Sequence, residues 1–217
     1  MPNPKNVLVI ADLHIPFEKE GYFEHCCKVQ EEYNCGKVIF IGDEIDSNSI
    51  SFHPKNADLY SPKDELELSK QKLKRWYKAF PNAVVINGNH TNLIKRKIAD
   101  AGLPSQVMRP LNEILEVPNW QHYDKYSYNG ILYIHGTGLS ANSVEKKVMY
   151  SQLPVVMGHL HSISRIQYYT QKLFSVIIGC GCDETALAFE YNKDNPKPSI
   201  VSTLVTKDKT PILIPMI

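Results

Sequence analysis

Short apolar runs that end abruptly in polar side chains recur along this sequence, and they constrain its fold more than any other feature. The runs NVLVIADLH, KVIFIGDEID and AVVINGNH each join a few β-branched residues to a polar end. Their length and composition predict buried strands, each followed by a loop. Because a segment with helical periodicity separates the first two runs, we expect an α/β core with parallel or mixed strands.

Two helices are predicted in the first half of the chain. In residues 17–34, apolar side chains recur at helical spacing, and Gly36 follows as a stop signal. The second helix begins with Ser61, Pro62 and Asp64 as N-cap, first-turn proline and third-position acid. Its charge changes from acidic to basic towards residue 82, which complements the helix dipole, so we interpret its lysine-rich end as a solvated face.

From Tyr126 onward the pattern changes to consecutive strands. They are expected at residues 130–136, 153–161, 165–170, 173–179, 186–191, 199–205 and 211–214. A strand-rich half after an α/β half predicts two packed mixed β-sheets flanked by helices, an αββα sandwich. A chain of 217 residues without repeats or linkers fits one domain, residues 1–217, with a helical insertion at about 47–80.

Composition narrows the class of protein. A net charge of +1 does not indicate nucleic acid or a membrane as a partner. The chain contains no apolar span of about 20 residues, as a membrane helix needs, and no signal-peptide layout at its start, so we expect a cytoplasmic protein. Five cysteines in no disulfide spacing fit a reducing compartment. Among them, Cys180 and Cys182 are interpreted as buried small apolar residues rather than metal ligands.

The polar side chains at the strand ends are the candidate functional residues. They are Asp12, His14, Asp43, Asp46, Asn89, His90, His135, His159 and His161. Ligands of α/β sheets gather at the carboxyl ends of the strands, so we expect these loops to converge on one crevice. In the segment GHLH, alternation along a strand would put both imidazoles on one face, where two histidines have little structural use.

Carboxylate and imidazole donors without thiolates suit manganese, iron, zinc, cobalt or nickel. The crowding of Asp43 and Asp46 points to the same chemistry, because like charges at close range are costly unless cations compensate them. Two metal ions about 3.5–4 Å apart that share Asp43 would do so. Glu44 is interpreted as a bystander that is turned away. The isolated histidines are interpreted as surface or core residues (His25 and His122) or as a candidate pocket residue (His53).

In their order along residues 7–162, these motifs resemble the calcineurin-like metallophosphoesterases. The matching motifs are Asp12-x-His14, Gly42-Asp43-x-x-Asp46, Gly88-Asn89-His90, His135 and Gly158-His159-x-His161. The resemblance implies the αββα fold and two divalent transition-metal ions, manganese first, with iron, zinc, nickel or cobalt as alternatives. It assigns one metal to Asp12, His14 and His161, the other to Asn89, His135 and His159, and the bridging position to Asp43. His90 would serve the leaving group, oriented by Asp46.

The sequence departs from the family pattern at two places, of which one concerns the class of substrate and the other the orientation of His90. Asp46 is followed by Ser47 and Asn48, where protein phosphatases of the family have arginine and glycine. Thr91 stands where many relatives have an acidic residue, so orienting His90 would be left to Asp46 alone. Residues 51–104 also resemble metallophosphoesterases of tailed bacteriophages, which would place the protein in the host cytoplasm.

The expected activity is therefore metal-dependent hydrolysis of phosphoesters, chiefly phosphodiesters or small nucleotide phosphates. One alternative is a metal-dependent nuclease acting on single-stranded nucleic acid, because the segments LKRWYK and NLIKRK together offer basic and aromatic residues that could track a phosphate backbone. The other alternative is a catalytically silent, metal-stabilised binding or regulatory protein. No membrane partner is expected, and the sequence carries no signal for an oligomeric state.

Overall fold

The computed structural model describes residues 3–52, 58–183, 185–192 and 197–217, so His53 lies outside the described residues. The strands are β1 Val7–Ile10, β2 Lys37–Phe40, β3 Val84–Ile86, β4 Gln121–Tyr123, β5 Lys125–Tyr128, β6 Ile131–Ile134, β7 Val155–Met157, β8 Ser164–Tyr168, β9 Phe174–Ile178, β10 Val201–Val205 and β11 Pro211–Pro215. The helices are α1 Tyr22–Glu32, α2 Pro62–Ala79, α3 Leu93–Asp100, α4 Leu111–Ile114 and α5 Val144–Ser151, with 3-10 turns η1 Asn48–Ile50, η2 Ser105–Val107 and η3 Leu187–Asn192.

Two mixed sheets form the centre of the molecule, which confirms the predicted fold class. The first has six strands in the order β11-β10-β1-β2-β3-β4, and the second has five in the order β5-β6-β7-β9-β8. Strands β1 to β4 are parallel, and so are β6, β7 and β9, whereas β10 and β11 and the outer strands β5 and β8 pair antiparallel. Parallel strands bring their carboxyl ends to one edge of each sheet.

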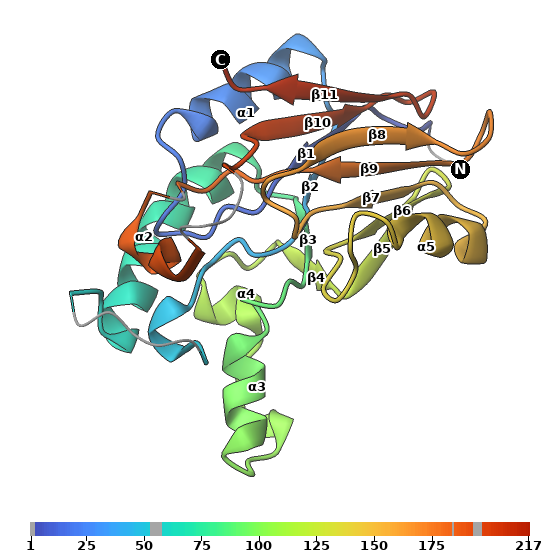
Figure 1. The fold of residues 1–217 in the computed structure, drawn as a ribbon. Helices are drawn as coiled ribbons and strands as arrows, with labels where there is room; N and C mark the ends of the chain where they lie inside the picture. The colour runs from blue at the N-terminus through green and yellow to red at the C-terminus, as the bar shows by residue number, and fades with distance from the viewer. Residues whose placement is uncertain (1–2, 53–57, 184, 193–196) are drawn as a thin grey trace.

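Burial on both faces explains why the central strands read as continuous apolar runs. Every residue of β1, β6 and β9 is buried. The main core joins the first sheet to the second and continues to α1 and α2. A smaller core lies beneath α5, whose Val144 and Val148 pack on the outer face of the second sheet. Figure 1 shows α1 and α2 outside the first sheet, α5 beside the second, and α3 projecting from the body.

Both predicted helices of the first half are present. Helix α1 is shorter than the predicted 17–34 because Glu18 forms a β-bridge to Cys182 and residues 20–21 and 33–34 form turns at its two ends. Helix α2 begins as predicted, with the Ser61 side chain accepting a hydrogen bond from the Asp64 backbone N–H at 3.2 Å. Within the proposed insertion at 47–80, the described residues form η1 and α2. The division of the chain into one domain with this insertion stays a prediction.

Two predictions about the second half were wrong. Residues 186–191 were expected to form a strand, but residues 187–192 form η3, which packs Phe189 against Phe17 and His14 at ring centroid distances of 6.0 and 5.3 Å. Ala188 and Phe189 are thus buried by a 3-10 turn over the strand ends and not by strand pairing. In the second case, β7 ends at Met157, so His159 and His161 lie in the loop that follows and not on a strand face.

The pattern also failed to indicate β4 and β5, whose residues alternate between exposed and half-buried positions at the sheet edges. In the part of the chain that the structure describes, no helix combines the length and the apolar character that crossing a membrane requires.

Candidate metal centre

The loops after β1, β2, β3, β6 and β7 bring the predicted side chains together at the carboxyl ends of the strands. All of the strand-end residues expected from the sequence take part in one connected set of close contacts. The set includes residues 147 positions apart, such as His14 and His161, whose Nε2 atoms are 3.2 Å apart. The topology of the two sheets accounts for this convergence.

Asp43 lies at the middle of the cluster. Its Oδ2 is 3.0 Å from His135 Nε2 and 4.0 Å from His14 Nε2, so one carboxylate oxygen faces histidines of both sheets. Its other oxygen, Oδ1, accepts hydrogen bonds from the backbone N–H groups of His90 at 2.8 Å and Thr91 at 3.3 Å. The loop after β3 therefore fixes the carboxylate and leaves Oδ2 directed at the cluster.

Asp12 and two histidines form one side of the cluster. Oδ2 of Asp12 accepts a hydrogen bond from the His159 backbone N–H at 2.8 Å and lies 3.4 Å from His161 Nε2. The rings of His14 and His161 meet edge to face, with centroids 4.8 Å apart. Asp12 and His14 are buried, whereas His161 is partly exposed.

Asn89, His135 and His159 form the other side. Asn89 Oδ1 lies 3.0 Å from His135 Nε2, and the His135 and His159 rings are 5.0 Å apart. The other ring nitrogen of His135, Nδ1, is 3.2 Å from the backbone oxygen of Ile41. That contact turns Nε2 towards Asn89 and Asp43.

Asp46 supports two histidines at once. Its Oδ1 is 2.5 Å from His14 Nδ1 and 3.1 Å from His90 Nδ1. The Asp46 backbone oxygen lies 2.7 Å from the same His90 nitrogen. The predicted contact with His90 is therefore present, but the contact with His14 was not foreseen. Through it, Asp46 holds a proposed metal ligand as well as the proposed proton donor.

Three overlapping groups of donors have the spacing of metal sites. In each group the donor atoms lie within 4.8 Å of one another: Asp12, His14 and His161; Asp43, His135 and His159; and His14, Asp43 and His90. Oδ1 of Asp12 is buried and has no hydrogen-bond partner among the described residues. A buried carboxylate oxygen without a partner is costly unless a cation meets it. The donor set and this unpaired oxygen both fit divalent transition metals.

The charged groups of the cluster shift one another's pKa values in opposite directions. Burial would raise the pKa of Asp43, but the neighbouring His135, His90 and His14 outweigh burial and lower that pKa. Burial would lower the pKa of His135, but Asp43 and Asp12 raise it to about 9. At neutral pH His135 therefore holds a proton where metal would bind, while Asp43 is ionised, so metal binding must displace the proton of His135.

Three residues of the cluster have a strained backbone. His14, Asp43 and His159 have φ of 50°, 46° and 69°, in the left-handed region that non-glycine residues rarely adopt. Glycine is required beside them: a Cβ on Gly88 would collide with Asp43 Oδ1, and a Cβ on Gly158 with Asp12 Oδ1. Such strain is typical of positions where side chains are held for function.

Glu44 is turned away from the cluster, as expected, but it is not at the surface. It is fully buried and accepts a hydrogen bond from the Thr91 hydroxyl at 2.7 Å, and its Oε1 lies 4.0 Å from His122 Nδ1. Burial raises the pKa of Glu44 to about 7 and lowers the pKa of His122 to about 4.

Cys180 and Cys182 are buried, as predicted, but they also adjoin the cluster. Cys182 Sγ lies 3.8 Å from His161 Nδ1, and the two thiols with His161 form a further group that has the spacing of metal ligands. Because His161 Nε2 faces Asp12 and His14, we interpret the cysteines as support for the ring's other nitrogen.

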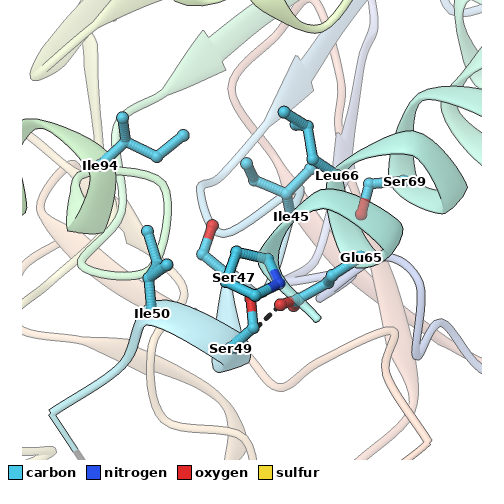
Figure 2. Close-up of a pocket in the computed structure, with 9 residues that line it drawn as sticks. Ile45, Ser47, Ser49, Ile50, Glu65, Leu66, Ser69 and Ile94 are labelled. Carbon is cyan, nitrogen blue, oxygen red and sulfur yellow. Dashed lines mark hydrogen bonds between the residues drawn. The ribbon is translucent and has the colours of Figure 1, made fainter. Parts of the chain in front are cut away.

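A small, mainly apolar pocket of about 220 Å³ lies beside the loop that carries Asp46 (Figure 2). Ile94 of α3 is on one side of it, and Ile45 and Leu66 are on the other. At its base, the Glu65 carboxylate accepts hydrogen bonds from the backbone N–H groups of Asn48 and Ser49, both at 2.8 Å. Glu65 thereby fixes η1 directly after Asp46.

Two solved structures are similar to this one over nearly the whole chain. An archaeal phosphodiesterase matches with a TM-score of 0.53 and 15% sequence identity, over 97% of this chain and 99% of that one. Vacuolar protein sorting 29 (Vps29) from Cryptosporidium parvum matches with a TM-score of 0.50 and 14% identity, over 97% of this chain and 96% of that one. No protein-family model and no curated protein matches the sequence.

The two mixed sheets and the flanking helices are those of the metallophosphoesterase-like fold. The chain thus has the fold of the calcineurin-like phosphoesterases, the family that its ordered motifs resemble. At identities of 14 and 15%, the likeness establishes the fold alone.

Proposed function

We propose that this protein is a dinuclear metal-dependent phosphoesterase that hydrolyses phosphodiesters or small nucleotide phosphates. The observation that carries the proposal is Asp43 Oδ2, which lies between a histidine of each sheet. A single carboxylate shared in this way is what a two-metal site requires. The fold of a phosphodiesterase and the donor groups at the strand ends support the same reading.

The proposed metal ligands divide into two sets that share Asp43. Asp12, His14 and His161 would hold one ion, and Asn89, His135 and His159 the other. Manganese is the first candidate, with iron, zinc, nickel or cobalt as alternatives. Two such cations supply positive charge for the phosphoryl oxygens and for an attacking water.

His90 is the proposed source of a proton for the leaving group. Burial would lower the pKa of His90, but the hydrogen bond with Asp46 and the charges of Asp43 and Asp46 raise it to about 9. A protonated imidazole held by Asp46 can donate to a departing oxygen. The backbone N–H of His90 binds Asp43 Oδ1, so the same residue also positions the shared carboxylate.

Phosphodiesters are preferred in this proposal over phosphoproteins. The loop after Asp46 continues with Ser47 and Asn48 and offers no arginine fork for a dianionic phosphoryl group. Asn48 instead hydrogen-bonds through its side chain to the Ala188 backbone oxygen at 3.1 Å. The bacteriophage likeness of residues 51–104 and a cytoplasmic location stay predictions.

The direct test is hydrolysis of bis-p-nitrophenyl phosphate and p-nitrophenyl phosphate by protein reconstituted with manganese. We expect manganese-dependent turnover, faster on the diester, that is lost on chelation and in Asp43→Asn. The matched control is Asp208→Asn, an exposed carboxylate in the turn between β10 and β11. Silence on both esters at full metal occupancy would favour the alternative of a metal-stabilised binding protein.

A further inference from the structure

Two hollows with basic walls lie beside the candidate metal centre. The near hollow, of about 610 Å³, contains Asn89 and His135 among its lining residues and therefore adjoins the centre. Arg96 of α3 and Lys147 of α5 also line it. Its single acidic lining residue, Asp124, already accepts a hydrogen bond from the Asn87 side chain at 2.9 Å. The near hollow thus presents a positive wall next to the proposed reaction site.

The far hollow, of about 340 Å³, continues from the near one. Asn87 and Asn92 line both hollows. The cations of the far hollow are Lys95 and Arg109, and no aspartate or glutamate is among its lining residues. We call the two hollows together the basic trough. Its cations are Arg96 and Lys147 in the near hollow and Lys95 and Arg109 in the far hollow.

The lining residues of the two hollows place the trough around α3, the helix that projects from the body in Figure 1. Lys95 and Arg96 are consecutive helical residues, so their side chains point about 100° apart. One lines the far hollow and the other lines the near hollow. A ligand that occupies both hollows must therefore bend around the start of α3, where Asn92 stands.

The cations of the trough differ from three basic residues of α2. On α2, Lys70 pairs with Glu116 at 2.8 Å, and Lys72 and Arg75 pair with Glu18 at 2.9 and 3.1 Å. These pairs neutralise part of the basic surface of α2, whose lysine-rich end was interpreted from the sequence as a solvated face.

Among the residues that the structure describes, no carboxylate lies within ion-pair distance of Lys95, Arg96, Arg109 or Lys147. Arg96 is instead held over the Phe52 ring, with its guanidinium carbon 4.7 Å from the ring centroid. A guanidinium stacked in this way keeps its N–H groups available at the edge of the plane. Unpaired, partly pre-positioned cations in a row are suited to a polyanion.

We propose that the substrate is single-stranded nucleic acid, which runs through the basic trough with one phosphodiester at the metal centre. This inference rests on the proposed function and names its substrate class. The phosphates that flank the reacting one would contact Arg96 and Lys147 on the near side and Lys95 and Arg109 beyond. A free nucleotide carries too few phosphate positions to use both hollows. A duplex is too stiff to bend around one helix, because its persistence length is about 150 base pairs.

The test measures binding of fluorescent oligothymidylates with phosphorothioate linkages, which resist cleavage, to the manganese-loaded protein by fluorescence anisotropy. Affinity should increase with length from a dinucleotide to a 12-mer. In Lys95→Gln/Arg109→Gln, 12-mer affinity should fall about tenfold at low salt, and the slope of log affinity against log salt should decrease by about 1.4, at roughly 0.7 for each lost phosphate contact. The control, Lys172→Gln/Lys207→Gln, removes two exposed lysines from strand connections outside the trough and should bind like wild type.

Three results would overturn the inference: equal affinity for the 12-mer in the Lys95/Arg109 variant and wild type, a mononucleotide bound as tightly as the 12-mer, or tighter binding of a duplex than of the single strand. The proposed function is tested separately by bis-p-nitrophenyl phosphate, which is too small to span both hollows. Turnover of that ester without length-dependent binding would refute the nucleic-acid substrate and leave the phosphoesterase standing.

Discussion

Replacing Asp46 by Asn removes the charge of one fully buried carboxylate that contacts two histidines with different proposed roles. Asp46 Oδ1 lies 2.5 Å from His14 Nδ1 and 3.1 Å from His90 Nδ1. Asparagine has the same shape and keeps one acceptor oxygen, but it is neutral. The variant therefore changes how firmly each ring is oriented without leaving a cavity.

The size of the effect follows from these contacts. A hydrogen bond to a charged group contributes about 1.5–3 kcal/mol, and loss of a group that orients a metal-bound histidine typically costs about 10–100-fold in metal affinity. Affinity should therefore fall by about 10–100-fold at the site that contains His14. The site formed by Asn89, His135 and His159 has no contact with Asp46 and should keep its affinity.

Isothermal titration of metal-free protein with manganese measures both sites. Wild type should show two binding events, and Asp46→Asn should show one of them selectively weakened. His90→Asn is the informative comparison, because it disturbs the other partner of Asp46 and leaves His14 in place. If Asp46→Asn bound both ions as tightly as wild type, Asp46 would not orient a metal ligand and the assignment of His14 would be wrong.

Three further predictions test neighbouring groups. His90→Asn should keep near-normal metal content but lower turnover by about 10²–10⁴-fold, more for alkyl than for p-nitrophenyl leaving groups; equal losses in steady-state assays of both would exclude proton donation. Because burial raises the folded-state pKa of Glu44 to about 7, its contribution to stability is greatest below its unfolded pKa and declines as pH rises towards 7. In urea unfolding of metal-free protein, the free energy of unfolding of Glu44→Gln should rise relative to that of wild type between about pH 4.5 and 7, by at most about 3 kcal/mol. A pH-independent difference would contradict this. Glu65→Gln removes an acceptor from the buried N–H groups of Asn48 and Ser49 and should cost about 1–3 kcal/mol in the same assay, whereas an unchanged unfolding midpoint would show that η1 does not depend on it.

The sequence was sufficient to predict the fold class and the convergence of the strand-end residues. Asp12, Asp43 and Asn89 each follow a buried parallel strand, and parallel topology places their loops at one edge. Period and composition indicate such strands because burial on both faces leaves little freedom in residue type.

Details that depend on tertiary contacts were not predictable in the same way. His159 and His161 reach the cluster through a left-handed turn after β7, although strand alternation was the reason given for their pairing. The second contact of Asp46, with His14, joins residues 32 positions apart and has no local signal. The run around Phe189 has the composition of a strand but is buried by packing over His14.

The central claim is that two metal ions share Asp43, and metal stoichiometry tests it most directly. Elemental analysis of the protein after reconstitution with manganese and removal of free metal should give close to two equivalents per chain. Asp43→Asn should lose both ions, because its Oδ2 faces His14 and His135 alike. The control Asp208→Asn should retain them. Fewer than one equivalent in the wild-type protein, or two equivalents retained in Asp43→Asn, would contradict the shared site.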